Sequence, residues 1–224
     1  MKIVYFDIIS GVSGNMILGS LLDAGLPALY LKEELLKLKL EFYDIKIEKQ
    51  SKNHITGTLF KVNVNLEKQP HRKFSEIETL LNESDLSSAI REKSLSIFEK
   101  LAQAESKVHG IPVNLVHFHE VGAIDSIIDI TGSVIGLDYF KPDRIHSAKV
   151  VNGHGGLISS SHGKLPNPAP ATLEVLKGIP CENINIKEEL TTPTGASILA
   201  MLVDEFSAPP DINISSIGYG CVRL

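Results

Sequence analysis

Residues 3–22 read IVYFDIISGVSGNMILGSLL, and this stretch sets the fold class. The apolar run over residues 3–8 is typical of a buried strand, and the glycines and serines of residues 10–14 break it. Apolar residues from Ile17 to Leu22 then recur at helical spacing. A strand that passes through a glycine-rich turn into a helix predicts an α/β protein.

The rest of the chain alternates strand and helix patterns in the same way. We expect further helices over 28–38, 75–81, 87–109, 123–137, 170–177 and 194–206, and strands over 42–48, 55–65, 113–119, 144–151, 183–187 and 212–217. Ser75 with Glu78 fits a capping box at the start of one helix. The expected fold is mixed α/β (α+β) in a single domain, 1–224: a sheet with flanking helices and a smaller hairpin-and-helix insertion at about 42–110.

Composition narrows the class of protein. The chain is 43 % apolar and carries a net charge of -5, so we expect no general affinity for nucleic acid or anionic membranes. No apolar run reaches the roughly 18 residues of a spanning helix, and the N-terminus lacks the layout of a secretion signal. Its two cysteines form no CxxC, which argues against a disulfide framework or a cysteine zinc site. We therefore expect a soluble cytoplasmic protein.

The run His117-Phe118-His119-Glu120 is the first candidate for chemistry. On a strand, residues i and i+2 project to one face, so His117 and His119 could bind one divalent cation. Glu120 could add an oxygen ligand or act as a general base. The alternative is a pair of half-buried histidines on an edge strand, hydrogen-bonded to backbone groups.

The following helix carries an acidic stripe. Asp125, Asp129, Gly132 and Gly136 lie on one face, and the opposite positions are isoleucines. Two carboxylates one turn apart repel each other unless a cation or donor lies between them. Each glycine costs roughly 1 kcal/mol of helix propensity relative to alanine, so close packing or a ligand should compensate. The sharper interpretation is one ion shared by the histidines, Glu120, Asp125 and Asp129; the alternative is a solvated acidic face.

Two other turns could bind an anion. Asp7 and the turn Ser10-Gly11-Val12-Ser13-Gly14 lie where a strand meets a helix, and free backbone N–H groups there favour a phosphate. Thr192, Thr194 and Gly195 precede another helix and could do the same. Helix capping by Ser13 and a proline-led cap at Thr192 are the simpler alternatives. Two histidine loops, 152–156 and 161–164, are weaker candidates.

At these residues the chain resembles a known family. The segments are FDxxxGxSG (6–14), VHFHEVGAxDSIxDI (116–130), LPxPAPAT (165–172), ELTTPTGA (189–196) and GYG (218–220). In this order they are similar to the LarC family of nickel-insertion proteins, over essentially the whole chain.

The resemblance implies an activity and its site. It implies a nickel chelatase, a lyase that inserts nickel into pyridinium-3,5-bisthiocarboxylic acid mononucleotide to form the nickel-pincer cofactor of lactate racemase. Nickel would be handled by the metal set His117, His119, Glu120, Asp125 and Asp129. The mononucleotide would be bound by Ser10, Gly11, Ser13, Gly14, Thr192, Thr194 and Gly195, and the displaced proton would pass to Asp7, Glu120 or Asp125.

The chain departs from the family pattern at three places. Asn15 stands where the family usually has aspartate, and His71-Arg72-Lys73 stands where it often has HRH. Members also continue beyond GYG into a part that binds CTP with Mg²⁺ or Mn²⁺, so that part is an expected partner, and a homo-oligomer is possible in principle. Two rivals stay open: a metal-dependent phosphohydrolase with Asp7 as nucleophile, and a non-catalytic scaffold that presents nickel.

Overall fold

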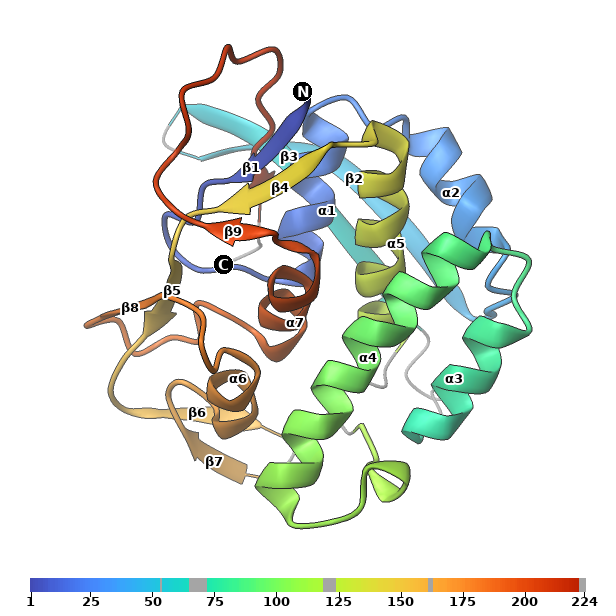
Figure 1. Cartoon of the computed structure of the whole chain (residues 1–224), viewed down its shortest axis with the longest axis vertical. Helices are drawn as coiled ribbons and strands as arrows, with labels where there is room; N and C mark the ends of the chain where they lie inside the picture. Colours follow the sequence, from blue (N-terminus) through green and yellow to red (C-terminus); the bar gives the residue numbers. More distant parts are fainter. Residues whose placement is uncertain (53, 65–71, 119–123, 161–162, 222–224) are drawn as a thin grey trace.

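The computed structural model describes residues 1–52, 54–64, 72–118, 124–160 and 163–221 (Figure 1). The elements are β1 (Ile3–Phe6), α1 (Gly14–Asp23), α2 (Ala28–Leu36), β2 (Tyr43–Lys52), β3 (Ile55–Val64), α3 (Phe74–Asn82), α4 (Ser88–His109), η2 (Val113–Leu115), α5 (Ile124–Phe140), β4 (Arg144–Ser147), β5 (Val150–Gly153), β6 (Leu157–Ser160), β7 (Gly163–Pro166), α6 (Pro170–Val175), β8 (Cys181–Ile184), α7 (Pro193–Leu202), β9 (Glu205–Phe206) and β10 (Gly220–Cys221). The mixed α/β prediction is confirmed.

The strands form small separate sheets in the described part of the chain, where we expected one larger sheet. β1, β4 and β9 are parallel, in the order β1-β4-β9. The predicted hairpin is β2 and β3, with β10 added in parallel beside β3. β5 pairs in parallel with β8, and β6 pairs antiparallel with β7. Figure 1 shows the β1-β4-β9 sheet beside α1, with α4 crossing the lower half of the molecule.

Helices α1 and α5 pack closely against each other, and the glycine stripe of α5 explains how. A Cβ added at Gly132 would lie 3.0 Å from Cδ1 of Leu18. One added at Gly136 would lie 2.9 Å from Cδ1 of Leu21. The cost of two glycines in a helix is therefore offset by close packing between helices, which is one of the two compensations the sequence allowed.

Helix α4 follows its sequence signals closely. The Ser87 hydroxyl accepts a hydrogen bond from the Ile90 N–H at 3.4 Å, and Gly110 ends the helix in the left-handed conformation at φ 66°. The capping-box prediction for α3, Ser75 with Glu78, is wrong by two residues. Lys73 is the N-cap residue, and its N–H donates to Glu76 Oε2 at 2.6 Å.

The prediction of a strand over 113–119 is wrong for its described part. Residues Val113–Leu115 form a 3₁₀ turn instead, and only an isolated antiparallel bridge joins His117 to Lys73. Phe118 lies buried at 1 % exposure with its ring 6.4 Å from that of Phe74. The segment is held in place by burial of this ring. It does not form the row of backbone hydrogen bonds to a neighbouring strand that a β-strand needs.

The prediction of a strand over 212–217 is also wrong, because these residues run exposed without strand pairing. The chain pairs a few residues later, at β10. A Cβ added at Gly220 would lie 1.9 Å from the Met16 carbonyl oxygen, and one at Gly218 would lie 2.0 Å from that of Ser20. The GYG segment is thus pressed against the backbone of α1, where only glycine fits.

One hydrophobic cluster runs through the described elements, from Phe6 in β1 through Phe60 and Leu101 to Leu199 in α7. The division of the chain into a main part and an insertion at about 42–110 stays a prediction. Among the described helices, none is both long enough and apolar enough to cross a membrane.

Candidate functional site

Two sequence motifs far apart in the chain meet at one junction, defined here as residues 11–14 with 190–195. The Val12 N–H donates to the Leu190 carbonyl at 2.9 Å, and the Thr192 N–H donates to the Val12 carbonyl at 3.0 Å. Gly11 has φ +95°, and a Cβ there would lie 2.1 Å from the Leu190 oxygen. The sequence predicted both motifs separately; the structure brings them together.

The junction also joins the N-termini of α1 and α7. The Thr192 hydroxyl accepts a hydrogen bond from the Gly195 N–H at 3.1 Å, so the simpler capping interpretation of Thr192 is confirmed. A Cβ added at Gly195 would lie 2.4 Å from the Val12 oxygen. Ser13 is the N-cap residue of α1, but its hydroxyl donates to Asn15 Oδ1 at 2.5 Å and does not cap the helix.

Asp129 of α5 lies against this junction. A Cβ added at Gly14 would lie 2.6 Å from Cβ of Asp129 and 2.8 Å from its Oδ2. The backbone N–H of Asn15 donates to the Asp129 carboxylate, as expected for an anion at a helix N-terminus. The other oxygen, Oδ1, is buried and has no hydrogen-bond partner within the described structure. A buried polar oxygen without a partner is unusual in a folded protein, which makes this carboxyl group a candidate for binding a ligand.

Burial raises the pKa of Asp129 well above its ordinary value, and the neighbouring charge of Asp125 raises it further. The hydrogen bond from Asn15 acts in the opposite direction. Asp125, one helical turn earlier, reaches the surface and accepts the Ser126 N–H at 2.9 Å. Partial desolvation raises the pKa of Asp125 as well. The two carboxyl groups repel, and a divalent cation would relieve both effects.

The histidine run is only partly visible. His117 is exposed at the bridge to Lys73, whereas His119 and Glu120 lie outside the described residues. Among residues that the structure describes, no group of three or more His, Cys, Asp or Glu side chains is placed to hold a metal ion. Of the predicted metal set, the structure therefore brings together Asp125 and Asp129.

The remaining candidates are more scattered. Asp7 is exposed directly after β1, and Ser10 is exposed in the following turn. His154 follows β5 and is exposed, and the histidine loop at 161–162 lies outside the described residues. Asp7 does not form a described three-residue group with the Asp125–Asp129 pair.

Two features near these motifs were not predicted from the sequence. Asn167 is buried and donates its Nδ2 to the Glu188 carbonyl at 3.0 Å. A polar residue between two prolines was the available signal. Arg72, across from Phe118, has a buried Nη1 without a described hydrogen-bond partner, and burial lowers the pKa of its guanidinium.

Comparison with known proteins bears on the whole chain. The family model described as "Nickel insertion protein" matches residues 4–223. A putative nickel insertion protein of Syntrophobacter fumaroxidans is 49 % identical over 98 % of this chain and 56 % of its own length. The pyridinium-3,5-bisthiocarboxylic acid mononucleotide nickel insertion protein of Clostridium kluyveri is 47 % identical over 98 % of this chain and 58 % of its own length.

A third relative, from Dictyoglomus thermophilum, is 42 % identical and is also named a putative nickel insertion protein. The chain thus spans little more than half the length of these relatives, at 56–58 %. No solved structure matches it significantly.

Proposed function

The chain belongs to the nickel insertion protein family, and we propose from this premise that it takes part in inserting nickel into pyridinium-3,5-bisthiocarboxylic acid mononucleotide. The name of the Clostridium kluyveri relative supports this substrate, and the product would be the nickel-pincer cofactor of lactate racemase. The observation that carries the proposal is the Asp125–Asp129 pair. It offers a buried carboxylate oxygen without a described partner, next to a second carboxyl group.

In this proposal nickel is the cargo, and the protein holds it only in passing. His117, His119, Glu120, Asp125 and Asp129 would bind the ion through imidazole nitrogens and carboxylate oxygens. Thiocarboxylate sulfurs are softer ligands, so the ion would pass readily from this set to the mononucleotide. A protein site without cysteine thiolates suits such a transfer, since it would not compete with the sulfurs of the substrate.

Formation of the nickel–carbon bond requires a base. One ring C–H bond breaks, its electron pair forms the bond to Ni²⁺, and the proton passes to a carboxylate, so no oxidant or reductant is needed. Asp7, Glu120 and Asp125 are the proposed acceptors. Asp125 is exposed and has a raised pKa, and a base of higher pKa holds a proton better near neutrality.

The junction residues Ser10, Gly11, Ser13, Gly14, Thr192, Thr194 and Gly195 would contact the mononucleotide. Their support is their position, because Gly14 lies directly against Asp129. A substrate bound along this junction would present its reacting ring to the carboxylate pair.

We further propose that the chain acts with the part present in its longer relatives, which would supply CTP with Mg²⁺ or Mn²⁺. A homo-oligomer is compatible with this arrangement. Both cysteines in the described structure are free, which suits the reducing cytoplasm as the place of action.

Anaerobic nickel insertion tests the proposal. The full chain, with CTP, Mg²⁺ and the additional part of the Clostridium kluyveri relative, would be given Ni²⁺ and the purified mononucleotide, and product formation followed by absorbance and mass. We expect Asp129→Asn, His117→Ala and His119→Ala to lower nickel affinity by at least about 10-fold and to reduce insertion. Asp138→Asn, also on α5, is the matched control.

Two outcomes would contradict the proposal. If the chain binds nickel stoichiometrically and the metallated product never forms under any of these conditions, the chain is a scaffold that presents the ion. If phosphate is released from simple phosphoesters with Mg²⁺ and Asp7→Asn abolishes the release, the phosphohydrolase rival is correct.

A further inference from the structure

A cleft of about 660 Å³ lies between the C-terminal end of α4 and helix α6. Its apolar lining includes Val108 from α4 with Pro168 and Leu173 from the segment around α6. Lys107, Lys177 and His154 add basic groups around it. The volume lies within the range of small-molecule sites, and an apolar wall with a few polar groups is their usual lining.

The walls of this cleft are built from two motifs that the carboxylate pair does not use. His154 belongs to the glycine-rich loop after β5, and Pro168 belongs to the LPxPAPAT segment. Asn167 fixes the two together, since its Nδ2 donates to the Glu188 carbonyl and a Cβ at Gly153 would lie 2.8 Å from the same nitrogen. The cleft is therefore a built part of the fold, held by buried polar contacts.

The cleft carries an excess of positive charge. Lys107 Nζ lies 2.9 Å from Glu174 Oε1, and Lys177 Nζ lies 2.6 Å from Oε2 of the same carboxylate. Hydrogen bonds from Lys177 and then Lys107 lower the pKa of Glu174. Two ammonium groups share one carboxylate, so one positive charge remains for an anionic ligand. A phosphate could accept from both lysines while they keep their contact with Glu174.

The cleft is connected to Asp129 by a short piece of backbone. Asn167 binds the Glu188 carbonyl, and Val12 binds the Leu190 carbonyl. Two residues of extended chain span roughly 7 Å. Gly14, two residues after Val12, lies against Asp129. Residues 188–190 thus link the wall of the cleft to the junction beside Asp129.

The helix N-termini at the junction are less suitable for a phosphate. The Asn15 N–H of α1 is already bonded to the Asp129 carboxylate, and a second anion there would be repelled. The Gly195 N–H of α7 is bonded to the Thr192 hydroxyl. A phosphate at either place would have to displace these contacts, whereas the two cleft lysines are exposed and share a single carboxylate.

We propose that this cleft binds the phosphate and ribose end of a pyridine mononucleotide, with Lys107 and Lys177 contacting the phosphate and Val108, Pro168 and Leu173 covering the sugar. The assignment of this ligand rests on the proposed function. It divides the substrate between two places: the phosphate in the cleft, and the ring toward the junction and Asp129.

Direct binding tests the proposal without any requirement for nickel. The full chain would be titrated calorimetrically with the bisthiocarboxylic mononucleotide and with the corresponding nucleoside, which lacks the phosphate. For the double variant Lys107→Ala/Lys177→Ala, we expect the mononucleotide Kd to rise about 10-fold. The nucleoside Kd should be unchanged, because the phosphate contact is absent from it.

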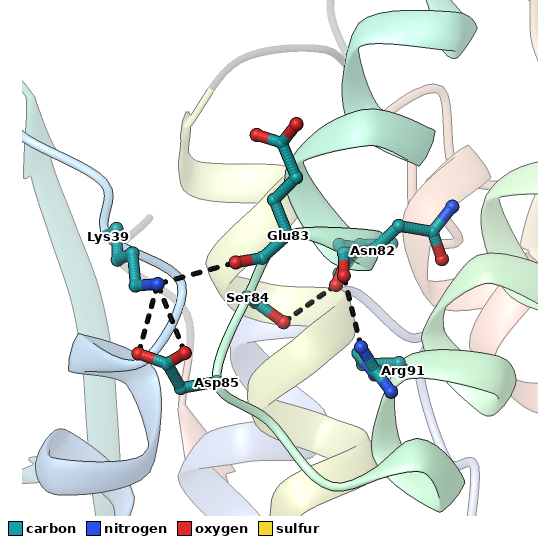
Figure 2. A network of polar contacts seen from close by, with 7 residues as sticks. Lys39, Asn82, Glu83, Ser84, Asp85 and Arg91 are labelled. Carbon is teal, nitrogen blue, oxygen red and sulfur yellow. Dashed lines mark hydrogen bonds and ion pairs between the residues drawn. The ribbon is translucent and has the colours of Figure 1, made fainter.

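Lys39→Ala is the matched control. Lys39 is a similarly exposed lysine whose ammonium lies 3.0 Å from Asp85 Oδ2, and Figure 2 shows it in a network with Glu83 and Asp85. Lys39 does not line the cleft. We expect the mononucleotide Kd of this variant to equal that of the wild type. Equal losses for Lys39→Ala and for the cleft double variant would overturn the proposal, since they would indicate a nonspecific charge effect.

Glu174→Gln gives a second test, in which binding should become tighter and not weaker. Removal of the shared carboxylate leaves both lysines for the phosphate, so we expect the mononucleotide Kd to fall roughly 2- to 5-fold. A merely structural ion-pair cluster would not tighten binding when it is broken. Unchanged binding in both the double variant and Glu174→Gln would overturn the proposal. Normal mononucleotide binding without nickel insertion by the wild type would contradict only the proposed function.

Discussion

The junction at residues 11–14 and 190–195 and the cleft between α4 and α6 are both built from distinctive motifs, but they are built in opposite ways. At the junction, backbone meets backbone so closely that a Cβ at Gly11 or Gly195 would lie within 2.4 Å of a carbonyl oxygen. In the cleft, long side chains surround an open space and their ion pairs face solvent. A glycine-rich motif is thus no sign of a ligand by itself, because packing alone can require it.

The largest effect on stability is expected at Gly195 of the junction. Replacement by alanine puts a methyl group 2.4 Å from the Val12 oxygen, so α7 or the α1 turn must shift. We expect a loss of about 3 kcal/mol in the free energy of unfolding, measured by urea denaturation.

Gly178→Ala is the control for this effect. Gly178 has φ +81°, but no atom lies within 4 Å of its added Cβ, so only backbone strain of about 1 kcal/mol is expected. Equal losses at the two positions would show that the junction is not tightly packed.

The next effect concerns Asp23, which holds α1 from its other end. Its Oδ1 accepts from the Thr58 hydroxyl at 2.6 Å, and its Oδ2 accepts from the Tyr219 N–H at 3.0 Å. Asp23→Ala leaves these donors unpaired, and we expect a loss of about 2 kcal/mol at pH 7. Such a loss would show that these contacts hold the C-terminal end of α1.

The loss at Asp23 should depend on pH. Burial raises the pKa of Asp23, but hydrogen bonds from Lys49 and Thr58 outweigh it, so the pKa is held below its ordinary value. A lowered pKa stabilises the fold above the pKa of the unfolded chain, and this stabilisation disappears as the pH falls through the folded value. The difference between wild type and variant should shrink in acid, as urea denaturation across this range would show; a constant difference would contradict the assignment.

A smaller effect of opposite sign is expected at Asp129. Burial and then the charge of Asp125 raise the pKa of Asp129, so the folded state binds its proton more tightly than the unfolded state. That contribution to stability is present at low pH and is lost as the pH rises through the folded pKa. Asp129→Asn removes the cost of the buried charge, and we expect a gain of roughly 1 kcal/mol at neutral pH without nickel.

Thermal denaturation with and without Ni²⁺ measures this effect. The variant should have a higher Tm than the wild type in the absence of nickel and a smaller rise on adding it. A lower Tm for the variant without nickel would mean that the Asp129 carboxylate stabilises the junction and is not available to a cation.

The smallest effect on stability is expected in the cleft. Lys107→Ala removes an exposed ion pair to Glu174, and such pairs contribute little because water screens them. We expect the Tm to change by less than about 1 °C. A larger decrease would show that the cleft is held together by its ion pairs, and would weaken the distinction drawn between the two regions.

Local patterns predicted the elements whose signals lie within the element itself. Helix α4 closely matches the predicted range 87–109, because the signals that begin and end it, at Ser87 and Gly110, act within one turn. The strand expected over 113–119 failed because Phe118 is fixed by long-range contacts with Phe74 and Phe98, which a local pattern does not contain. The strand expected over 212–217 failed because pairing depends on where β3 presents an open edge.

The same distinction between local signals and long-range contacts applies to the candidate site. The helical repeat determined from sequence alone that Asp125 and Asp129 share a face of α5, because residues four apart must do so. Only the tertiary structure decided that Asp129 meets the N-terminus of α1, and that Lys107 meets Glu174 and Lys177. These contacts join segments distant in the chain, and their placement depends on how α1, α4 and α5 pack, which no single segment encodes.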